Sequence, residues 1–178
     1  MKKFFLLLCS LTIVFSAGCG ASAQKQIPEE TTATARAAAK AVTAPGFTLA
    51  KLGGGNVAVV PEKDGKLYVL NFWATWCPPC RQELPDINTF AEKYGRTLAF
   101  YGINLDEPEG TVKEFMEKNK LTFPVLLDKG GKAARQYQVR AIPTTYIVDR
   151  KGVVRFHKVG MTSLQELEQA VKAIQAGQ

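Results

Sequence analysis

Two uninterrupted apolar runs dominate the hydrophobic pattern of this chain, KLYVLNFW at residues 66–73 and TLAFYGINL at residues 97–105. Runs of this length, rich in β-branched and aromatic residues, are typical of central strands buried on both faces of a sheet. Between them, apolar residues recur at helical spacing (Leu84, Ile87, Phe90, Ala91 and Tyr94). The pattern predicts a strand–helix–strand unit with two parallel strands.

Shorter patterns extend this unit at both ends. We predict strands in GFTLAKL and GGGNVAVV, a helix opened by a Thr111–Glu114 capping box, a strand in FPVLL, a short helix at 132–137, a hairpin turning at RKG (150–152), and a last helix capped by Ser163 and Glu166. The element order is β-β-β-α-β-α-β-α-β-β-α. This order predicts an α/β fold, a three-layer α/β/α sandwich around a mixed central sheet.

The first residues have the pattern of an export signal. Lys2 and Lys3 precede an apolar stretch, Phe4–Phe15, that is too short to span a membrane. The sequence FSAGC ending at Cys19 resembles a lipoprotein box, in which the cysteine becomes the lipidated N-terminus. An ordinary signal-peptidase site after Ala23 is the alternative. We expect a signal of lipoprotein type within residues 1–23, ending before Cys19, and a mature protein outside the cytoplasm, anchored to a membrane by lipid.

Composition divides the rest of the chain into two parts. Residues 24–44 are rich in Ala and Thr and contain no aromatic residue, so we predict a tether there and one folded domain at 45–178. The net charge of the whole chain is +7, but from Pro45 onward 18 Lys and Arg residues stand against 14 Asp and Glu residues. Because these basic residues are scattered, a solvated surface is favoured over nucleic-acid binding.

The stretch FWATWCPPCRQELP places Cys77 and Cys80 at a predicted strand-to-helix junction. A structural staple is disfavoured, because so small a loop removes little entropy from the unfolded chain. A zinc site is disfavoured as well, because zinc takes three or four ligands and the one histidine of the chain, His157, is predicted in a hairpin strand. The spacing and its context favour a redox-active dithiol with no metal.

Position within this motif predicts the role of each cysteine. Cys77 is expected to cap the helix, where the dipole and free N–H groups favour a thiolate, and to be the nucleophile. Cys80 is expected to be more buried and to resolve the mixed disulfide. Pro78 and Pro79 have no N–H, which leaves mainly the amides of Cys80 and Arg81 for the thiolate. A less stabilised thiolate means a more reducing couple, so the prolines favour a reductase.

Two further residues are predicted to lie near the cysteines. We expect a cis bond between Ile142 and Pro143, placed against the cysteine pair. Trp76 is expected in a hydrophobic rim around Cys77, whereas Trp73 is predicted to lie in the core.

The segments FTL, LNFWATWCPPCRQELP, GIN, FPVLLD and IPTTYIVDRKG resemble the TlpA/ResA/CcmG-type branch of the thioredoxin-like proteins, over about residues 45–176. The resemblance implies a thioredoxin fold with an added N-terminal β-hairpin and thiol:disulfide exchange, usually reductive, without a cofactor. The implied partners are a protein thiol or disulfide substrate and a membrane thiol-transfer protein as electron donor. Several members of this branch reduce the haem-binding cysteines of apocytochrome c. We expect a monomer.

The resemblance also directs attention to two polar positions. Asn71 stands where ordinary thioredoxins carry a buried Asp, six residues before the first cysteine, and an amide cannot relay a proton. The branch often has an acidic residue after its second core strand, where this chain offers Asp106 and Glu107, and the family's pattern favours Glu107. A partly buried Glu107 with a raised pKa could accept the proton of Cys80. An exposed loop acid beside Pro108 is the alternative.

Other classes of function are less consistent with the sequence. A peroxiredoxin requires a Thr three residues and a Pro seven residues before its reactive cysteine, where this chain has Ala74 and Leu70. A non-catalytic binding module would not need both cysteines. A general periplasmic reductase, or an oxidant, with no link to cytochrome c remains open.

Overall fold

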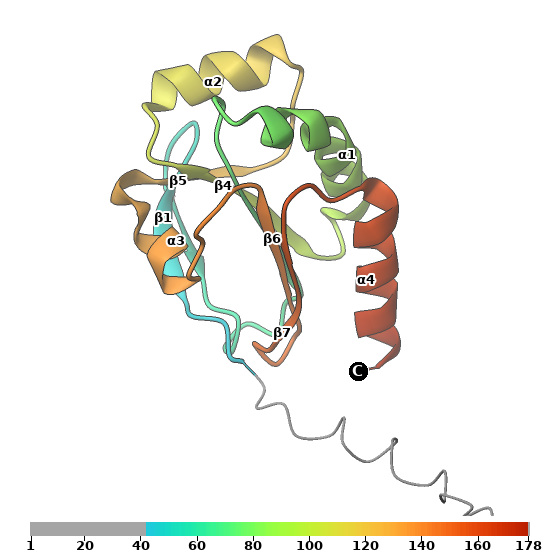
Figure 1. The fold of residues 1–178 in the computed structure, drawn as a ribbon. Coiled ribbons are helices and arrows are strands. Elements are labelled where there is room, and N and C mark those ends of the chain that lie inside the picture. The colour runs from blue at the N-terminus through green and yellow to red at the C-terminus, as the bar shows by residue number, and fades with distance from the viewer. Residues whose placement is uncertain (1–41, 178) are drawn as a thin grey trace, which may run out of the picture. The chain divides into compact units, whose positions relative to one another are not determined.

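The computed structural model describes residues 42–177, which contain one seven-stranded sheet in the order β2-β1-β5-β4-β3-β6-β7 (Figure 1). β3 is parallel to β4, and β4 is parallel to β5, while β1, β2, β6 and β7 pair antiparallel to their neighbours. The strands are β1 (Phe47–Lys51), β2 (Asn56–Val59), β3 (Tyr68–Trp73), β4 (Ala99–Leu105), β5 (Val125–Asp128), β6 (Thr144–Val148) and β7 (Val154–Val159).

Helices cover both faces of this sheet, so the predicted three-layer arrangement is confirmed. One core cluster joins the sheet to α1 (Pro78–Tyr94), α2 (Glu109–Lys118) and α4 (Leu164–Ala176). The opposite cluster joins it to α3 (Lys132–Gln136), which follows a single 3₁₀ turn. The fold is thioredoxin-like, and the predicted order of elements is the observed one.

The position of β3 explains why the functional segment lies where it does. Every residue of β3 is buried, because the strand lies between β4 and β6 and has helices on both faces. The chain leaves β3 at Trp73, and α1 begins at Pro78. The cysteine pair therefore sits at the carboxyl end of a central strand, the usual place for a site in an α/β sheet.

The start of α2 differs from the prediction. The helix begins at Glu109 with Pro108 as its N-cap, and no side chain caps it. The predicted capping box at Thr111 and Glu114 is therefore wrong. Pro108 holds a φ of −59°, which suits a chain about to enter a helix, so the helix forms before Thr111 is reached. The capping box of Ser163 and Glu166 at the start of α4 is confirmed by both of its hydrogen bonds.

The chain enters the domain beside the β6–β7 hairpin. Val42 accepts a hydrogen bond from Val154, and Ala44 donates one of 2.8 Å to Gly152. Ala44 is buried, so these last residues of the predicted tether are part of the fold. The predicted signal, the rest of the tether and Cys19 lie outside the described residues. Within residues 42–177, none of the helices combines the length and the apolar character that a membrane span needs.

Candidate active site

Cys77 and Cys80 form a disulfide at the N-terminus of α1, with their Cα atoms 5.3 Å apart. Cys77 is the N-cap residue of the helix, and its sulfur accepts the backbone N–H of Cys80 at 3.2 Å. Cys77 retains 3% of its surface, whereas Cys80 has none exposed. Of the two cysteines, Cys77 is therefore the one that combines capping geometry with some exposed surface.

The backbone of this first turn offers the sulfur few donors. Pro78 and Pro79 occupy the first two helical positions and have no N–H. The N–H of Arg81 donates to the carbonyl oxygen of Cys77 at 3.1 Å, so it takes part in the helix ladder and does not reach the sulfur. The amide of Cys80 is thus the one backbone donor to the Cys77 sulfur in this turn, one fewer than expected from the sequence.

The loop before β6 approaches the disulfide from the other side. The bond between Ile142 and Pro143 is cis, as predicted from the sequence. The carbonyl oxygen of Ile142 lies 3.7 Å from the Cys77 sulfur, within reach of a reduced thiol. Pro143 is buried, and its carbonyl oxygen accepts the N–H of Gly160 at 2.8 Å. The segment around Gly160 is thereby held beside the cysteine pair.

An apolar rim, which we define as Trp76, Val159 and Met161, combines the residue before Cys77 with the two residues that flank Gly160. These are the large hydrophobic residues most exposed in the described part of the chain apart from Val42, at 65%, 58% and 46%. Trp76 precedes Cys77 directly, and the other two flank Gly160. The sequence pointed to Trp76, but the other two were missed because only the fold brings the end of β7 to the cysteines.

Glu83 is a buried carboxyl group that was not singled out from the sequence. It lies on α1 one turn after Cys80, and only 3% of it is exposed. Its carboxylate accepts the amide of Asn71 at 2.8 Å and the backbone N–H of Thr162 at 2.7 Å. Burial raises its pKa from 4.5 to about 7, against the opposing effect of these hydrogen bonds. Asn71 therefore donates to the buried carboxylate of Glu83, and it stands at the position where thioredoxins are expected to have a carboxylate of their own.

A simple spacing could have indicated Glu83. Cys77, Cys80 and Glu83 follow one another at intervals of three residues, which places neighbours on one helix face with Cβ atoms about 5–6 Å apart. An acid at such a position, beside the apolar face of the helix, is unusual for a surface charge. The partner Thr162, 79 positions further along the chain, could not have been inferred.

Glu107, the acid chosen from the sequence, is buried as well, with 8% of its surface exposed. It accepts the backbone N–H of Thr75 at 2.8 Å, the hydroxyl of the same residue, and the amide of Asn104 at 2.6 Å. The alternative of an exposed loop acid is therefore wrong. The carboxylate ties the loop after β4 to the residues that precede Cys77.

The histidine considered as a metal ligand is engaged elsewhere. His157 lies in β7, and its ring stacks on that of Tyr146, with centroids 4.3 Å apart. Across residues 42–177, no group of three or more His, Cys, Asp or Glu side chains is arranged to hold a metal ion.

Comparison with families and known proteins agrees with this geometry. The family model described as the AhpC/TSA family matches residues 41–157. The thioredoxin-like protein YneN of Bacillus subtilis is 43% identical over 129 residues, which cover 71% of this chain and 75% of YneN. The thiol-disulfide oxidoreductase ResA of Bacillus thuringiensis is 36% identical over 132 residues, which cover 74% of this chain and 76% of ResA.

A solved structure shows the same arrangement of elements. The crystal structure of StoA from Bacillus subtilis superposes with a TM-score of 0.64 and 29% identity, covering 74% of this chain and 98% of StoA. StoA is named a sporulation thiol-disulfide oxidoreductase. The names of these relatives, thioredoxin-like protein and thiol-disulfide oxidoreductase, agree with thiol–disulfide exchange in a thioredoxin-like domain.

Proposed function

We propose that this chain uses Cys77 and Cys80 to reduce disulfides of proteins outside the cytoplasm. The proposal proceeds from its family: the chain belongs to the AhpC/TSA family of thioredoxin-like proteins and is a thiol:disulfide oxidoreductase. The observation that carries this proposal is the position of Cys77 as the N-cap of α1, with its sulfur accepting the N–H of Cys80. The positive end of the helix dipole and this donor favour a Cys77 thiolate over the thiol.

The reaction proceeds in two exchanges. The Cys77 thiolate attacks one sulfur of the substrate disulfide, forms a mixed disulfide, and displaces the second substrate sulfur as a thiolate, which takes a proton from water. The Cys80 thiol loses its proton, and its sulfur attacks that of Cys77. This step forms the Cys77–Cys80 disulfide and releases the other substrate thiolate. The substrate gains two electrons and the protein loses two.

Glu83 is the group best placed to accept the proton of Cys80. It lies one turn further along α1, and a pKa of about 7 leaves it partly ionised near neutral pH, where a general base is most effective. Glu107, proposed from the sequence for this step, already accepts three hydrogen bonds. We therefore assign Glu107 to holding the loop that leads to Cys77, and Glu83 to the proton.

The direction of transfer follows from how weakly the thiolate is held. Pro78 and Pro79 have no N–H group, and the N–H of Arg81 donates to the carbonyl oxygen of Cys77. The N–H of Cys80 is the one backbone donor in this turn that remains for the sulfur. A thiolate with few donors disfavours the reduced form and makes the couple more reducing. We expect a potential of about −200 to −270 mV, and a value near −120 mV would instead make the protein an oxidant.

Substitution of each cysteine by serine tests the proposal. Cys80→Ser should trap the substrate as a mixed disulfide on Cys77, because attack remains possible and resolution does not. Cys77→Ser should trap nothing and should be inactive. Non-reducing gels of each variant mixed with an oxidised protein substrate, followed by mass spectrometry, measure both. Trapping by Cys77→Ser would reverse the two roles.

Finer features of the function rest on the family resemblance. We propose apocytochrome c cysteines as one substrate and a membrane thiol-transfer protein as the donor that reduces Cys77 and Cys80 again. Lipidation at Cys19, which lies outside the described residues, would keep the domain near that donor. Reductive chemistry and the apolar rim of Trp76, Val159 and Met161, suited to an unfolded protein chain, support a polypeptide substrate.

A further inference from the structure

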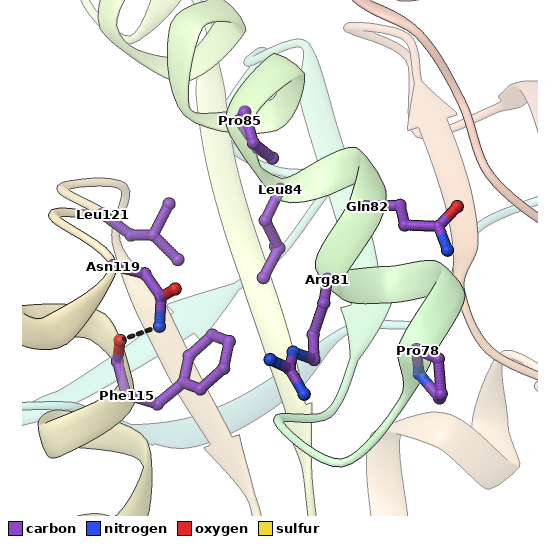
Figure 2. A pocket seen from close by; sticks show the side chains of 8 residues that line it. All are labelled: Pro78, Arg81, Gln82, Leu84, Pro85, Phe115, Asn119 and Leu121. Atoms are coloured by element: carbon purple, nitrogen blue, oxygen red, sulfur yellow. Dashed lines mark hydrogen bonds between the residues drawn. The ribbon is translucent and has the colours of Figure 1, made fainter.

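A hollow opens beside the first turns of α1, between that helix and α2 (Figure 2). Its volume is about 400 Å³, which lies in the range of pockets that bind ligands. Pro78 forms part of its wall and directly follows Cys77, so the groove begins one residue from the reactive sulfur. We call it the α1–α2 groove.

The lining of this groove combines an apolar floor with one cation. Leu84, Phe115 and Leu121 supply the apolar surface, and the guanidinium carbon of Arg81 lies 6.0 Å from the centre of the Phe115 ring. None of the eight lining residues is acidic (Figure 2). Among residues 42–177, no carboxylate forms an ion pair with Arg81. The charge at the groove is thus positive and has no counterion there.

A hydrogen-bond acceptor stands opposite this cation. The side-chain amide nitrogen of Asn119 donates to the carbonyl oxygen of Phe115 at 2.8 Å, as the dashed line in Figure 2 shows. The amide oxygen of Asn119 is left to accept an N–H group from outside the domain. A cation, an acceptor and an apolar floor, arranged within one groove, match a short peptide that carries a carboxylate and a large apolar side chain.

We propose that the α1–α2 groove binds the segment of the protein substrate that flanks its reactive cysteine, with an acidic side chain at Arg81 and an aromatic or large aliphatic one against Phe115 and Leu121. This inference rests on the proposed function, since the flanking segment reaches the groove when the substrate sulfur is at Cys77. The apolar rim holds the substrate on the opposite side of the disulfide. The groove adds the selectivity for sequence and charge.

Peptides with an activated cysteine test this proposal. Each peptide carries a phenylalanine and one cysteine disulfide-bonded to thionitrobenzoate, and the three versions differ only in an Asp, Asn or Lys next to the phenylalanine. The Cys77 thiolate of reduced Cys80→Ser protein attacks the peptide sulfur and displaces coloured thionitrobenzoate, which gives the rate constant. We expect the Asp peptide to react roughly two- to fivefold faster than the Lys peptide, as for an exposed ion pair, and the difference to shrink with added salt.

Variants separate the groove from the charge of the whole protein. Arg81→Ala should abolish the preference and Arg81→Glu should reverse it. The matched control is Arg96→Glu, which changes the net charge equally at an exposed position after the other end of α1 and should retain the preference. Ratios between peptides cancel any change in the intrinsic reactivity of Cys77. Equal rates for all three peptides, or an equal effect of both glutamate variants, would overturn the proposal.

Crosslinking locates the bound peptide directly. A benzophenone side chain replaces the phenylalanine in the trapped Cys80→Ser complex, and the product is mapped by mass spectrometry after irradiation. We expect crosslinks at Phe115 to Leu121. Crosslinks confined to Val159–Met161 would place the flanking segment on the rim and refute the groove. No reaction of Cys77 with any peptide would refute the proposed function and this inference together, whereas equal reaction with all would refute the inference alone.

Discussion

Two buried glutamates lie on the segments around the cysteine pair, and they differ in the number of hydrogen bonds that their carboxylates accept. Glu107 accepts three hydrogen bonds, two of them from Thr75 in the segment before Cys77. Glu83 accepts two, from Asn71 and Thr162, and burial raises its pKa to about 7. Burial with few donors raises the pKa of Glu83, which lets this carboxyl group exchange its proton near neutral pH.

The difference shows that burial alone does not identify a functional acid. Glu107 connects two loops at the carboxyl ends of β3 and β4, and its hydrogen bonds fix the approach to Cys77. Glu83 projects from α1, the helix that also carries Cys80. We therefore expect changes at Glu83 to alter the chemistry, and changes at Glu107 to alter mainly stability.

The largest expected effect is that of Glu83→Gln on resolution of the mixed disulfide. Loss of a general base typically slows proton transfer by a factor of about 100 or more. Formation of the mixed disulfide by Cys77 should change little, because Glu83 acts on Cys80. Single-turnover mixing of the reduced protein with an activated peptide disulfide separates the two steps.

Glu107→Gln is the matched control for this measurement. Its resolution step should slow by less than tenfold. A Glu107→Gln variant that resolves more slowly than Glu83→Gln would invert the comparison and restore the role first predicted for Glu107 from the sequence.

The next effect is on the pH dependence of stability. A pKa of about 7 in the folded protein, against 4.5 ordinarily, means that Glu83 binds its proton more tightly when folded. The contribution is fully present below about pH 4.5 and is lost as pH rises through about 7, a loss of about 3 kcal/mol. Urea unfolding of the oxidised protein between pH 4.5 and 8, compared with Glu83→Gln, isolates this slope.

The comparison between variants matters because other groups titrate with the opposite sign. Burial acts to raise the pKa of Asp149, but hydrogen bonds from Val153, Arg155 and Lys151 together outweigh it and lower the pKa, so the contribution of Asp149 to stability is lost at acid pH. An unchanged slope in Glu83→Gln would show that another group carries the titration.

The smallest of the three effects is that of Glu107→Gln on stability at constant pH. The glutamine amide would face a donor that now bonds the carboxylate, so one buried hydrogen bond to a charged group is lost, at about 2 kcal/mol. Thr75→Val, which removes only the hydroxyl donor, should cost less. Urea denaturation of both variants measures the order, and equal stability of Glu107→Gln and wild type would contradict the structural role.

The core of the fold could be predicted because it follows from local pattern. The two buried runs form β3 and β4, and the cysteines lie at the junction between β3 and α1. The cis bond before Pro143 was foreseen from its place just before the hairpin strand, since cis peptide bonds occur almost only before proline. The start of α2 was mispredicted because both Pro108 and Thr111 can stand at the start of a helix. The structure uses Pro108, so the helix begins at Glu109, before Thr111.

The site was predictable only where its parts are close in sequence. Glu83 follows Cys80 by three residues, but its hydrogen bond from Thr162, 79 positions further along the chain, depends on the fold. Val159 likewise comes to lie opposite Thr144, next to Pro143, through the pairing of β6 with β7. The different roles of Glu83 and Glu107 could not be predicted either, because the number of hydrogen-bond donors around each carboxylate depends on the fold and not on the residue type.

The attachment of Val42 and Ala44 to the β6–β7 hairpin has a mechanical consequence. Val42 and Ala44 bond next to the turn at Gly152, at the end of β6 away from Pro143. Five residues of β6 separate the two ends by about 14 Å. A pulling force applied to the chain at Val42 would therefore act on these hydrogen bonds, at the end of β6 away from Pro143. The cysteine pair, which contacts Ile142 just before the other end of β6, lies away from these hydrogen bonds.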